Sequence, residues 1–246
     1  MADQPRTADF AIWLVALALY AFDAARLLSP RELLLVETGG GRLAAVFSAY
    51  PFTLGGRILA FAPLTRPHRG VFVAPWGRAW SAEPVLRATL GWVEALRRTL
   101  LPARLLAAAA FVLLFVVGPA LTLLLGSDPA VLWTAALVYP TAVAAVGVLW
   151  WRRRAFGLTA RHAALLSLEV LVCPAFLPNL VRKITTARPV EADGAQILLA
   201  TASDDVKAEF LARLSSRAEE LINEAAGDAT RQAALRNYLA AVRAAR

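Results

Sequence analysis

The side chains with the most chemical potential in this sequence are two carboxylates set in apolar segments. Asp23 follows 13 uncharged residues near the N-terminus, and Glu169 lies in the middle of the apolar stretch 160–181. A charged side chain inside a membrane segment is costly, and such residues commonly bind protons, ions or lipid headgroups. We therefore predict Glu169 and Asp23 as candidate intramembrane functional acids. Two simpler interpretations stay open: Asp23 pairs with Arg26 near the interface, or Glu169 faces water or an arginine from an in-plane helix.

The sequence contains no catalytic or cofactor signature. Its two histidines and its single cysteine, Cys173, form no cluster with metal-ligand spacing, and no G-x-S-x-G motif occurs. The glycines at 39–41 lack the Lys-Ser/Thr of a phosphate loop, and no helix follows them. The net charge of +8 is explained by where the arginines lie relative to the apolar segments. We expect a protein that is not an enzyme and has no cofactor, metal, nucleotide or nucleic-acid partner.

The elements that must position the two acids begin with an apolar helical hairpin. Between Arg104 and Arg152 the only charged residue is Asp128. Two apolar runs of about 20 residues flank it, each long enough to cross a hydrocarbon core of roughly 30 Å. Gly126 is suited to end the first helix and Pro129 to begin the second. With 59% hydrophobic residues, the chain is also too apolar for an ordinary soluble domain. The sequence therefore predicts an integral membrane protein.

The positions of the basic residues predict the orientation. Residues 10–28 form a third, weaker apolar span, and the leader before it contains acids, unlike a secretory signal. The segments 26–104 and 152–246 contain all 26 basic residues except Arg6, whereas the hairpin tip has none. Since basic segments stay in the cytoplasm, we predict an outside N-terminus and a cytoplasmic C-terminus. The preference for arginine over lysine is typical of GC-rich genomes, so we expect a multi-pass protein of a bacterial inner membrane.

The apolar stretch 160–181 has two interpretations. Pro174 and Pro178 limit its regular helix to about 160–173, a rise of only about 21 Å. Basic residues flank both of its ends, so a single crossing would place one basic cluster outside. We predict a re-entrant or in-plane helix. The alternative is a complete fourth span, which would move the C-terminal tail to the outside.

The remaining segments are predicted to lie in the cytoplasm. Residues 32–76 alternate short β-branched and aromatic runs with turns, which indicates a small sheet. Residues 82–101 have the 3.6-residue periodicity of an amphipathic helix, which either lies on lipid or packs on that sheet. The tail contains two helices separated by Gly227 and Asp228, with complementary charges that favour an antiparallel hairpin.

These features define the predicted fold class and its segments. The class is a membrane α-helical protein with three transmembrane helices, a re-entrant or in-plane helix, a small β-rich cytoplasmic insert and a C-terminal helical hairpin. The predicted segments are an anchor over 1–28, the β-rich element over 29–80, a juxtamembrane helix over 81–103, the transmembrane hairpin over 104–151, the re-entrant segment over 152–183, a linker over 184–202 and the tail hairpin over 203–246.

Two further sets of residues are candidates for binding. Arginines on predicted turns and helix ends next to the membrane are suited to anionic lipid; they are Arg66, Arg69, Arg87, Arg97, Arg98, Arg152, Arg153 and Arg154. An isolated helix pair buries little core, so we expect the tail to dock on a protein partner or on the rest of the chain. Its candidate partner-binding residues are Phe210, Leu214, Leu221, Tyr238 and Leu239.

The sequence leads to two functional hypotheses. The first is a non-catalytic scaffold, assembly factor or accessory subunit of a membrane complex, with the lipid bilayer and either a protein partner or a second copy as its partners. The second is a small transporter or lipid-handling component that uses Glu169 and Asp23, and with so few spans it would need to form oligomers or join a complex.

Overall fold

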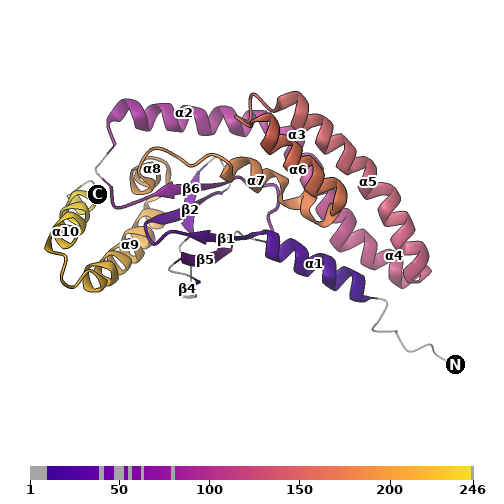
Figure 1. Ribbon diagram of the computed structural model, residues 1–246, viewed down its shortest axis with the longest axis horizontal. Coiled ribbons are helices and arrows are strands. Elements are labelled where there is room, and N and C mark those ends of the chain that lie inside the picture. The colour runs from indigo at the N-terminus through magenta and orange to yellow at the C-terminus, as the bar shows by residue number, and fades with distance from the viewer. Residues whose placement is uncertain are drawn as a thin grey trace. The chain divides into compact units, whose positions relative to one another are not determined.

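The computed structural model describes residues 10–38, 42–46, 53–54, 57–61, 64–78 and 81–244 (Figure 1). The chain divides into two compact units. The first, which we call the helical unit, comprises Met1–Ala25, Pro63–Gly70 and Ala95–Ala187. The second, the mixed unit, comprises Arg26–Ala62, Val71–Glu94 and Arg188–Arg246. The glycine turn predicted at 39–41 lies outside the described residues.

The predicted apolar hairpin is confirmed in the helical unit. Helix α3 (Leu101–Val112) continues through a π-helical turn (Leu113–Val117) into α4 (Gly118–Leu125), and α5 (Ser127–Arg152) returns beside it. Gly126 joins the two with a φ of +87°, a conformation that favours glycine. The two arms, 25 and 26 residues long, are long and apolar enough to cross a membrane.

The third predicted span is shorter than its sequence indicated. Helix α1 comprises Ala11–Asp23, and its 13 residues rise only about 20 Å, too little to cross a hydrocarbon core. The chain then enters strand β1 (Ala25–Leu28), which pairs with β5. Three transmembrane helices are therefore not confirmed. The apolar run 10–28 consists of a short helix and a strand, because its last four residues form β1 and pair with β5.

The stretch after the hairpin forms the short helix that its prolines predicted. Helix α6 (Ala160–Val172) begins at Thr159, whose hydroxyl accepts a hydrogen bond from the His162 amide. It is followed by a 3₁₀ helix, η4 (Pro174–Asn179), and by α7 (Leu180–Thr186). The segment 160–181 is thus a helix, a turn and a second helix, and no continuous helix covers it.

The mixed unit contains two small antiparallel sheets. In one, β2 (Glu32–Glu37) lies between β3 (Leu43–Val46) and β6 (Val71–Pro75); the other has the order β1–β5–β4, with β5 at Arg57–Phe61 and β4 at Thr53–Leu54. Five consecutive residues of β2, from Leu33 to Glu37, are buried, so this central strand is covered on both faces.

Helices cover the first sheet. Helix α2 (Glu83–Thr99) confirms the predicted amphipathic helix, and its Trp92 packs edge-on against Phe72 of β6, with 6.0 Å between the ring centroids. This contact supports the interpretation that α2 packs on the sheet. Helix α8 (Gly194–Thr201) lies on β2, where Gly194 approaches Leu33 and Ala74 so closely that an added Cβ would lie 3.0 Å from the Ala74 Cβ.

The segment predicted as a linker, 184–202, therefore contains a core helix. Asp193 caps α8 by accepting a hydrogen bond from the Ala195 amide, and Ile197 and Leu198 are fully buried. The two tail helices are confirmed as α9 (Asp204–Glu224) and α10 (Ala229–Ala244), with Gly227 at a φ of +105° between them. The tail is part of the mixed unit rather than a separate domain.

Candidate functional site

The helical unit brings the two predicted acids onto one lysine. The Lys183 ammonium in α7 lies 2.8 Å from an Asp23 carboxylate oxygen and 2.5 Å from one of Glu169. The side chain of Lys183 is 9% exposed, that of Asp23 14% and that of Glu169 45%. The ammonium also lies 4.8 Å from the centroid of the Phe176 ring. We call Asp23, Glu169 and Lys183 the lysine cluster.

A second cation lies beside this cluster. The Arg182 side chain is 3% exposed and donates to the Asn179 side-chain oxygen at 2.5 Å. Its guanidinium carbon lies 5.5 Å from the Tyr20 ring centroid. Asn179 in turn donates to the Tyr20 carbonyl oxygen at 2.9 Å, and the Tyr20 hydroxyl donates to the Leu64 carbonyl oxygen. Arg182 and Lys183 thus balance the charges of Asp23 and Glu169 within one network.

The two acids lie on short helices, Asp23 on α1 and Glu169 on α6, which pack against different parts of the hairpin. At the start of α1, Trp13 donates to Thr122, close to the turn between α4 and α5, at 2.8 Å. Near the end of α1, Tyr20 packs against Phe111 and Phe115, about halfway along the first arm. Helix α1 therefore lies along the half of the first arm nearest the turn (Figure 1).

Helix α6 begins at the opposite end of the hairpin. It follows α5 through a turn at 153–159, and its Ser167 accepts a hydrogen bond from Trp150, near the end of α5, at 3.0 Å. The last turns of α1 and α6 both meet α7 at Lys183. Because helix C-termini carry partial negative charge, each helix end adds to the attraction that its acid exerts on the ammonium.

The sequence identified the two acids but missed the cations that they bind. The arginine predicted as the partner of Asp23 was Arg26, whereas the structure pairs Asp23 with Lys183. In the sequence, Arg182 and Lys183 indicate only a basic flank of the apolar stretch. One signal was available: Lys183 is one of only two lysines among 26 basic residues, and it directly follows an apolar stretch that contains an acid.

The predicted lipid-binding arginines fall in both units. Arg87 lies in the mixed unit, where it pairs with Glu83 at 2.9 Å. The other seven belong to the helical unit. Among them, Arg152 stacks on the Trp151 ring at 4.7 Å and Arg153 lies 5.5 Å from the Trp150 ring centroid. The structure therefore gathers only part of this set, around the end of α5.

The predicted partner-binding residues of the tail belong to the core of the mixed unit. Phe210, Leu214, Leu221, Tyr238 and Leu239 are all buried. The Tyr238 ring packs against Trp76, with 6.2 Å between the ring centroids. The tail thus docks on its own chain, and Leu239 also lines a groove on the surface of the hairpin.

A buried polar network fastens the tail to the rest of the mixed unit. The Tyr238 hydroxyl donates to Asp193 at 2.9 Å. Gln196 in α8 makes two hydrogen bonds with the backbone of Ser81, and the Ser81 hydroxyl accepts from the Asp193 amide. Burial raises the pKa of the Asp193 carboxyl, against the lowering effect of the Tyr238 and amide hydrogen bonds, and burial also raises the pKa of Tyr238.

This network predicts a pH-dependent stability. The pKa of the Asp193 carboxyl is raised in the folded chain. The stability that this carboxyl contributes to the fold is therefore fully present below its unfolded pKa of 3.8, and it is lost as the pH rises through the folded pKa. Asp193→Asn keeps an oxygen for Tyr238 and Ala195 and removes the titration. We expect amide hydrogen exchange in α8 and α10 to slow in this variant relative to wild type as the pH rises above 4. A difference in exchange rate between the variant and wild type that is the same at every pH would contradict the prediction.

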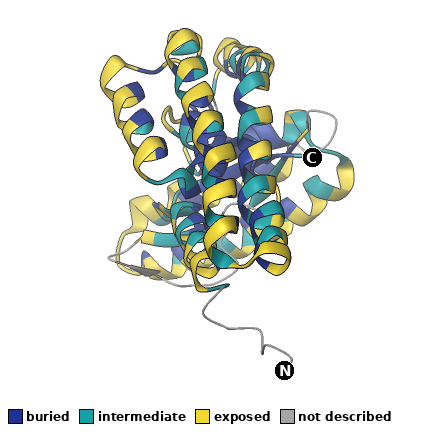
Figure 2. Ribbon diagram, turned by 90° about the vertical axis from the view of Figure 1, so that its right-hand side faces the viewer, coloured by how far each residue is buried: buried dark blue, intermediate teal, exposed yellow. Residues whose placement is uncertain are grey.

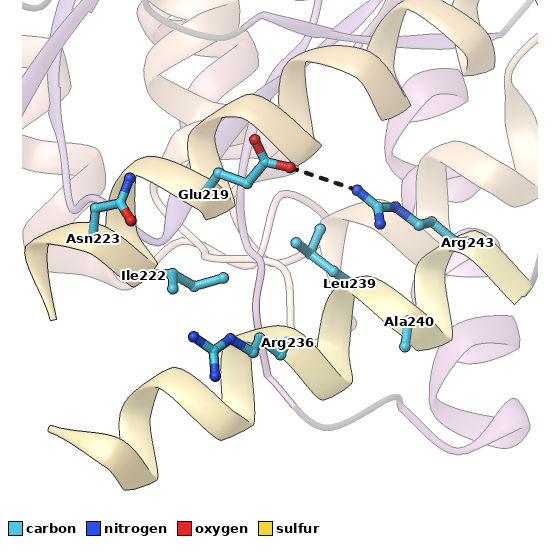
Figure 3. Close-up of a pocket in the computed structure, with 7 residues that line it drawn as sticks. All are labelled: Glu219, Ile222, Asn223, Arg236, Leu239, Ala240 and Arg243. Atoms are coloured by element: carbon cyan, nitrogen blue, oxygen red, sulfur yellow. Dashed lines mark ion pairs between the residues drawn. The ribbon is translucent and has the colours of Figure 1, made fainter. Parts of the chain in front are cut away.

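A groove lies on the surface of the tail hairpin (Figure 3). It has a volume of about 340 Å³ and is formed by α9 and α10. Glu219 and Arg243 form an ion pair across it at 3.7 Å, and Arg236 lies along its edge. The residues that line it are Glu219, Ile222, Asn223, Arg236, Leu239, Ala240 and Arg243. Its apolar residues are Ile222, Leu239 and Ala240, and Arg236 lies beside the Glu219–Arg243 pair.

The lysine cluster and the tail groove are two places where the structure gathers side chains of functional interest. Within the described ranges, no group of three His, Cys, Asp or Glu side chains is placed to hold a metal ion. Comparison with known proteins gives no match: no family model, no curated protein and no solved structure is significantly similar to this chain.

Proposed function

We propose that this protein is a non-catalytic membrane anchor and scaffold, an accessory subunit of a bacterial inner-membrane complex. The observation that supports it most is that many apolar residues of the hairpin are exposed; exposed positions are yellow in Figure 2. Large side chains on both arms point outward, with Leu124 78% exposed and Trp151 76% exposed. In water such a surface is unfavourable, whereas the hydrocarbon of a bilayer covers it at no cost.

The proposed orientation places the hairpin turn outside. The turn contains one charge, Asp128, whereas basic residues precede α3 and follow α5. The Trp13 end of α1 lies near the turn, which supports an outside N-terminus. Lys183 and the neighbouring Arg182 together balance the two acids of the lysine cluster, as expected of a structural device that lets short helices pack inside an apolar unit.

The mixed unit is then the part that recognises a partner from the cytoplasm. We assign this role to the tail groove, since Arg236 lies along the edge of its apolar residues. A partner helix with acidic residues beside an apolar face would match both features. The rest of the mixed unit positions the groove, because Tyr238 on α10 donates a hydrogen bond to Asp193.

The proposal is tested by cross-linking from the groove in intact cells. The full chain, with Cys173→Ser, receives a single cysteine at Ala240 and a photoactivatable maleimide. We expect one membrane-complex protein to be trapped at Ala240 and to be lost when Arg236→Glu reverses the rim charge. A cysteine at the exposed Ala212 of α9 is the control position. Equal trapping from both positions, or trapping unchanged by Arg236→Glu, would contradict a partner role for the groove.

A small transporter or lipid-handling component is the second candidate. The observation that favours it is the shared Lys183, through which a proton could pass between Asp23 and Glu169. Glu169 is the more accessible of the two acids. Glu169→Gln should abolish such an activity, and full activity in that variant would exclude the role.

A further inference from the structure

The turn that joins α5 to α6 concentrates unpaired positive charge. Arg152 ends α5, Arg153 and Arg154 follow in the turn, and Arg161 lies in the first turn of α6. Within the part of the chain that the structure describes, none of these four arginines has an acidic partner within 4.0 Å. From residue 95 to residue 168 the sequence contains one acid, Asp128, at the far end of α5. Any counter-charge must therefore come from outside this turn.

Two of these arginines lie against aromatic rings. The Arg152 guanidinium lies 4.7 Å from the Trp151 ring centroid, and Arg153 lies 5.5 Å from that of Trp150. Trp150 is itself fixed by its hydrogen bond to Ser167. These contacts restrict the Arg152 and Arg153 side chains, which lowers the entropy that these two lose when a ligand binds.

The turn itself is closed by backbone hydrogen bonds. The amides of residues 156, 157 and 158 donate to the carbonyl oxygens of Arg152, Arg154 and Arg153, respectively. Gly157 adopts a φ of +69°, and Phe156 and Leu158 are buried beneath the turn. The N-terminus of α6, with its partial positive charge and no acid in its first turn, adds to the field of the arginines.

We propose that residues 152–161 form a binding site for the phosphate of an anionic phospholipid headgroup. Arginine is suited to phosphate because its planar guanidinium donates two parallel hydrogen bonds to it. The exposed Trp151 adjoins the site and has the amphipathic ring that is enriched at headgroup level. The inference rests on the proposed membrane anchoring, and it adds a lipid class and a defined site to that function.

The test compares lipids that differ only in headgroup charge. Purified full-length protein in neutral detergent is titrated with phosphatidylglycerol or with phosphatidylcholine of the same acyl chains. We expect wild type to bind phosphatidylglycerol roughly ten- to a hundred-fold more tightly, which corresponds to about 1.4–2.8 kcal/mol. The variant Arg152→Gln/Arg153→Gln/Arg154→Gln should lose this preference.

A matched control separates the site from net charge. Arg213→Gln/Arg217→Gln/Arg231→Gln removes the same charge from the tail helices and should keep the preference for phosphatidylglycerol. A wild type with equal affinity for both lipids would overturn the proposal, as would a triple variant at 152–154 that keeps the preference. Competition by inorganic phosphate at equal concentration would overturn it too, since the site would then bind free phosphate.

A second experiment distinguishes failure of the lipid site from failure of the membrane anchor on which it rests. Membranes that contain the wild-type chain are washed with alkaline carbonate. If the protein stays in the pellet but shows no headgroup preference, only the lipid site is wrong. If carbonate extracts the protein, the membrane anchor itself is wrong.

Discussion

Lys183→Met is expected to destabilise the helical unit by about 2–4 kcal/mol, slightly less than the loss of one member of a fully buried ion pair. The substitution keeps most of the side-chain volume but removes the charge that faces both Asp23 and Glu169. Arg182 would then be the remaining cation near Asp23 and Glu169, and the largely buried Asp23 carboxylate would lose the ammonium that it contacts. The expected loss of stability is smaller than for a fully buried ion pair, because Glu169 is nearly half exposed and can turn toward solvent or headgroups.

The second lysine of the chain provides the control. Lys207 pairs with Asp204 at 3.2 Å on the surface of α9, where the Asp204 side chain is 99% exposed. Lys207→Met should therefore change stability by less than about 0.5 kcal/mol. The measurement is thermal unfolding of the full chain in detergent, with hydrogen exchange of α1 and α6 as the local readout.

A double variant shows whether the cause is charge. Asp23→Asn in the Lys183→Met background removes one of the two stranded carboxylates, so it should recover part of the lost stability. If Lys183→Met is as mild as Lys207→Met, the lysine cluster does not hold the two short helices. If the double variant is less stable than Lys183→Met alone, the loss comes from packing rather than from unpaired charge.

Gly118→Ala is expected to cost about 1–3 kcal/mol, because α1 packs directly against this position. A Cβ at Gly118 would lie 2.4 Å from the Trp13 ring, a distance that requires the indole to move. Trp13 is buried and donates to Thr122 at 2.8 Å, so moving it also breaks a buried hydrogen bond. Thermal unfolding in detergent should show the loss, with faster hydrogen exchange in α1.

Gly147→Ala is the matched control for this contact. Gly147 lies in α5, and an added Cβ there meets nothing within 4 Å. This variant should be neutral or more stable by up to about 1 kcal/mol, since alanine favours the helix. Trp13→Phe combined with Gly118→Ala should be less harmful than the two single changes added together, because the smaller ring relieves the clash. Strict additivity would show that the two residues do not meet.

The sequence alone determined the parts of this protein that depend on local pattern. The hairpin arms, the turn at Gly126, the end of α6 before Pro174 and the break at Gly227 were all predicted where they occur. Each depends on the length of an apolar run or on a residue with a special backbone preference. Such signals act within one or two turns of chain, so they can be read without knowing the fold.

Two local patterns were misleading. The run 10–28 is apolar throughout, yet it is a helix up to Asp23 and a strand from Ala25, since apolar composition suits both structures. The segment 184–202 contains proline, glycine and acids, which are typical of linkers, but α8 forms there because its apolar face is buried on β2. Tertiary packing decided both cases.

Only the tertiary structure decided which residues meet. Asp23 and Glu169 share Lys183, and Tyr238 reaches Asp193, across separations at which sequence periodicity carries no information. The same holds for the apolar stripe of the tail, from Phe210 to Leu239. Periodicity showed that α9 and α10 each have a face to bury, but the surface that buries it is the rest of the mixed unit. A pattern in one segment specifies that it needs a partner, whereas the choice of partner depends on the shape and charge of segments far away in the chain.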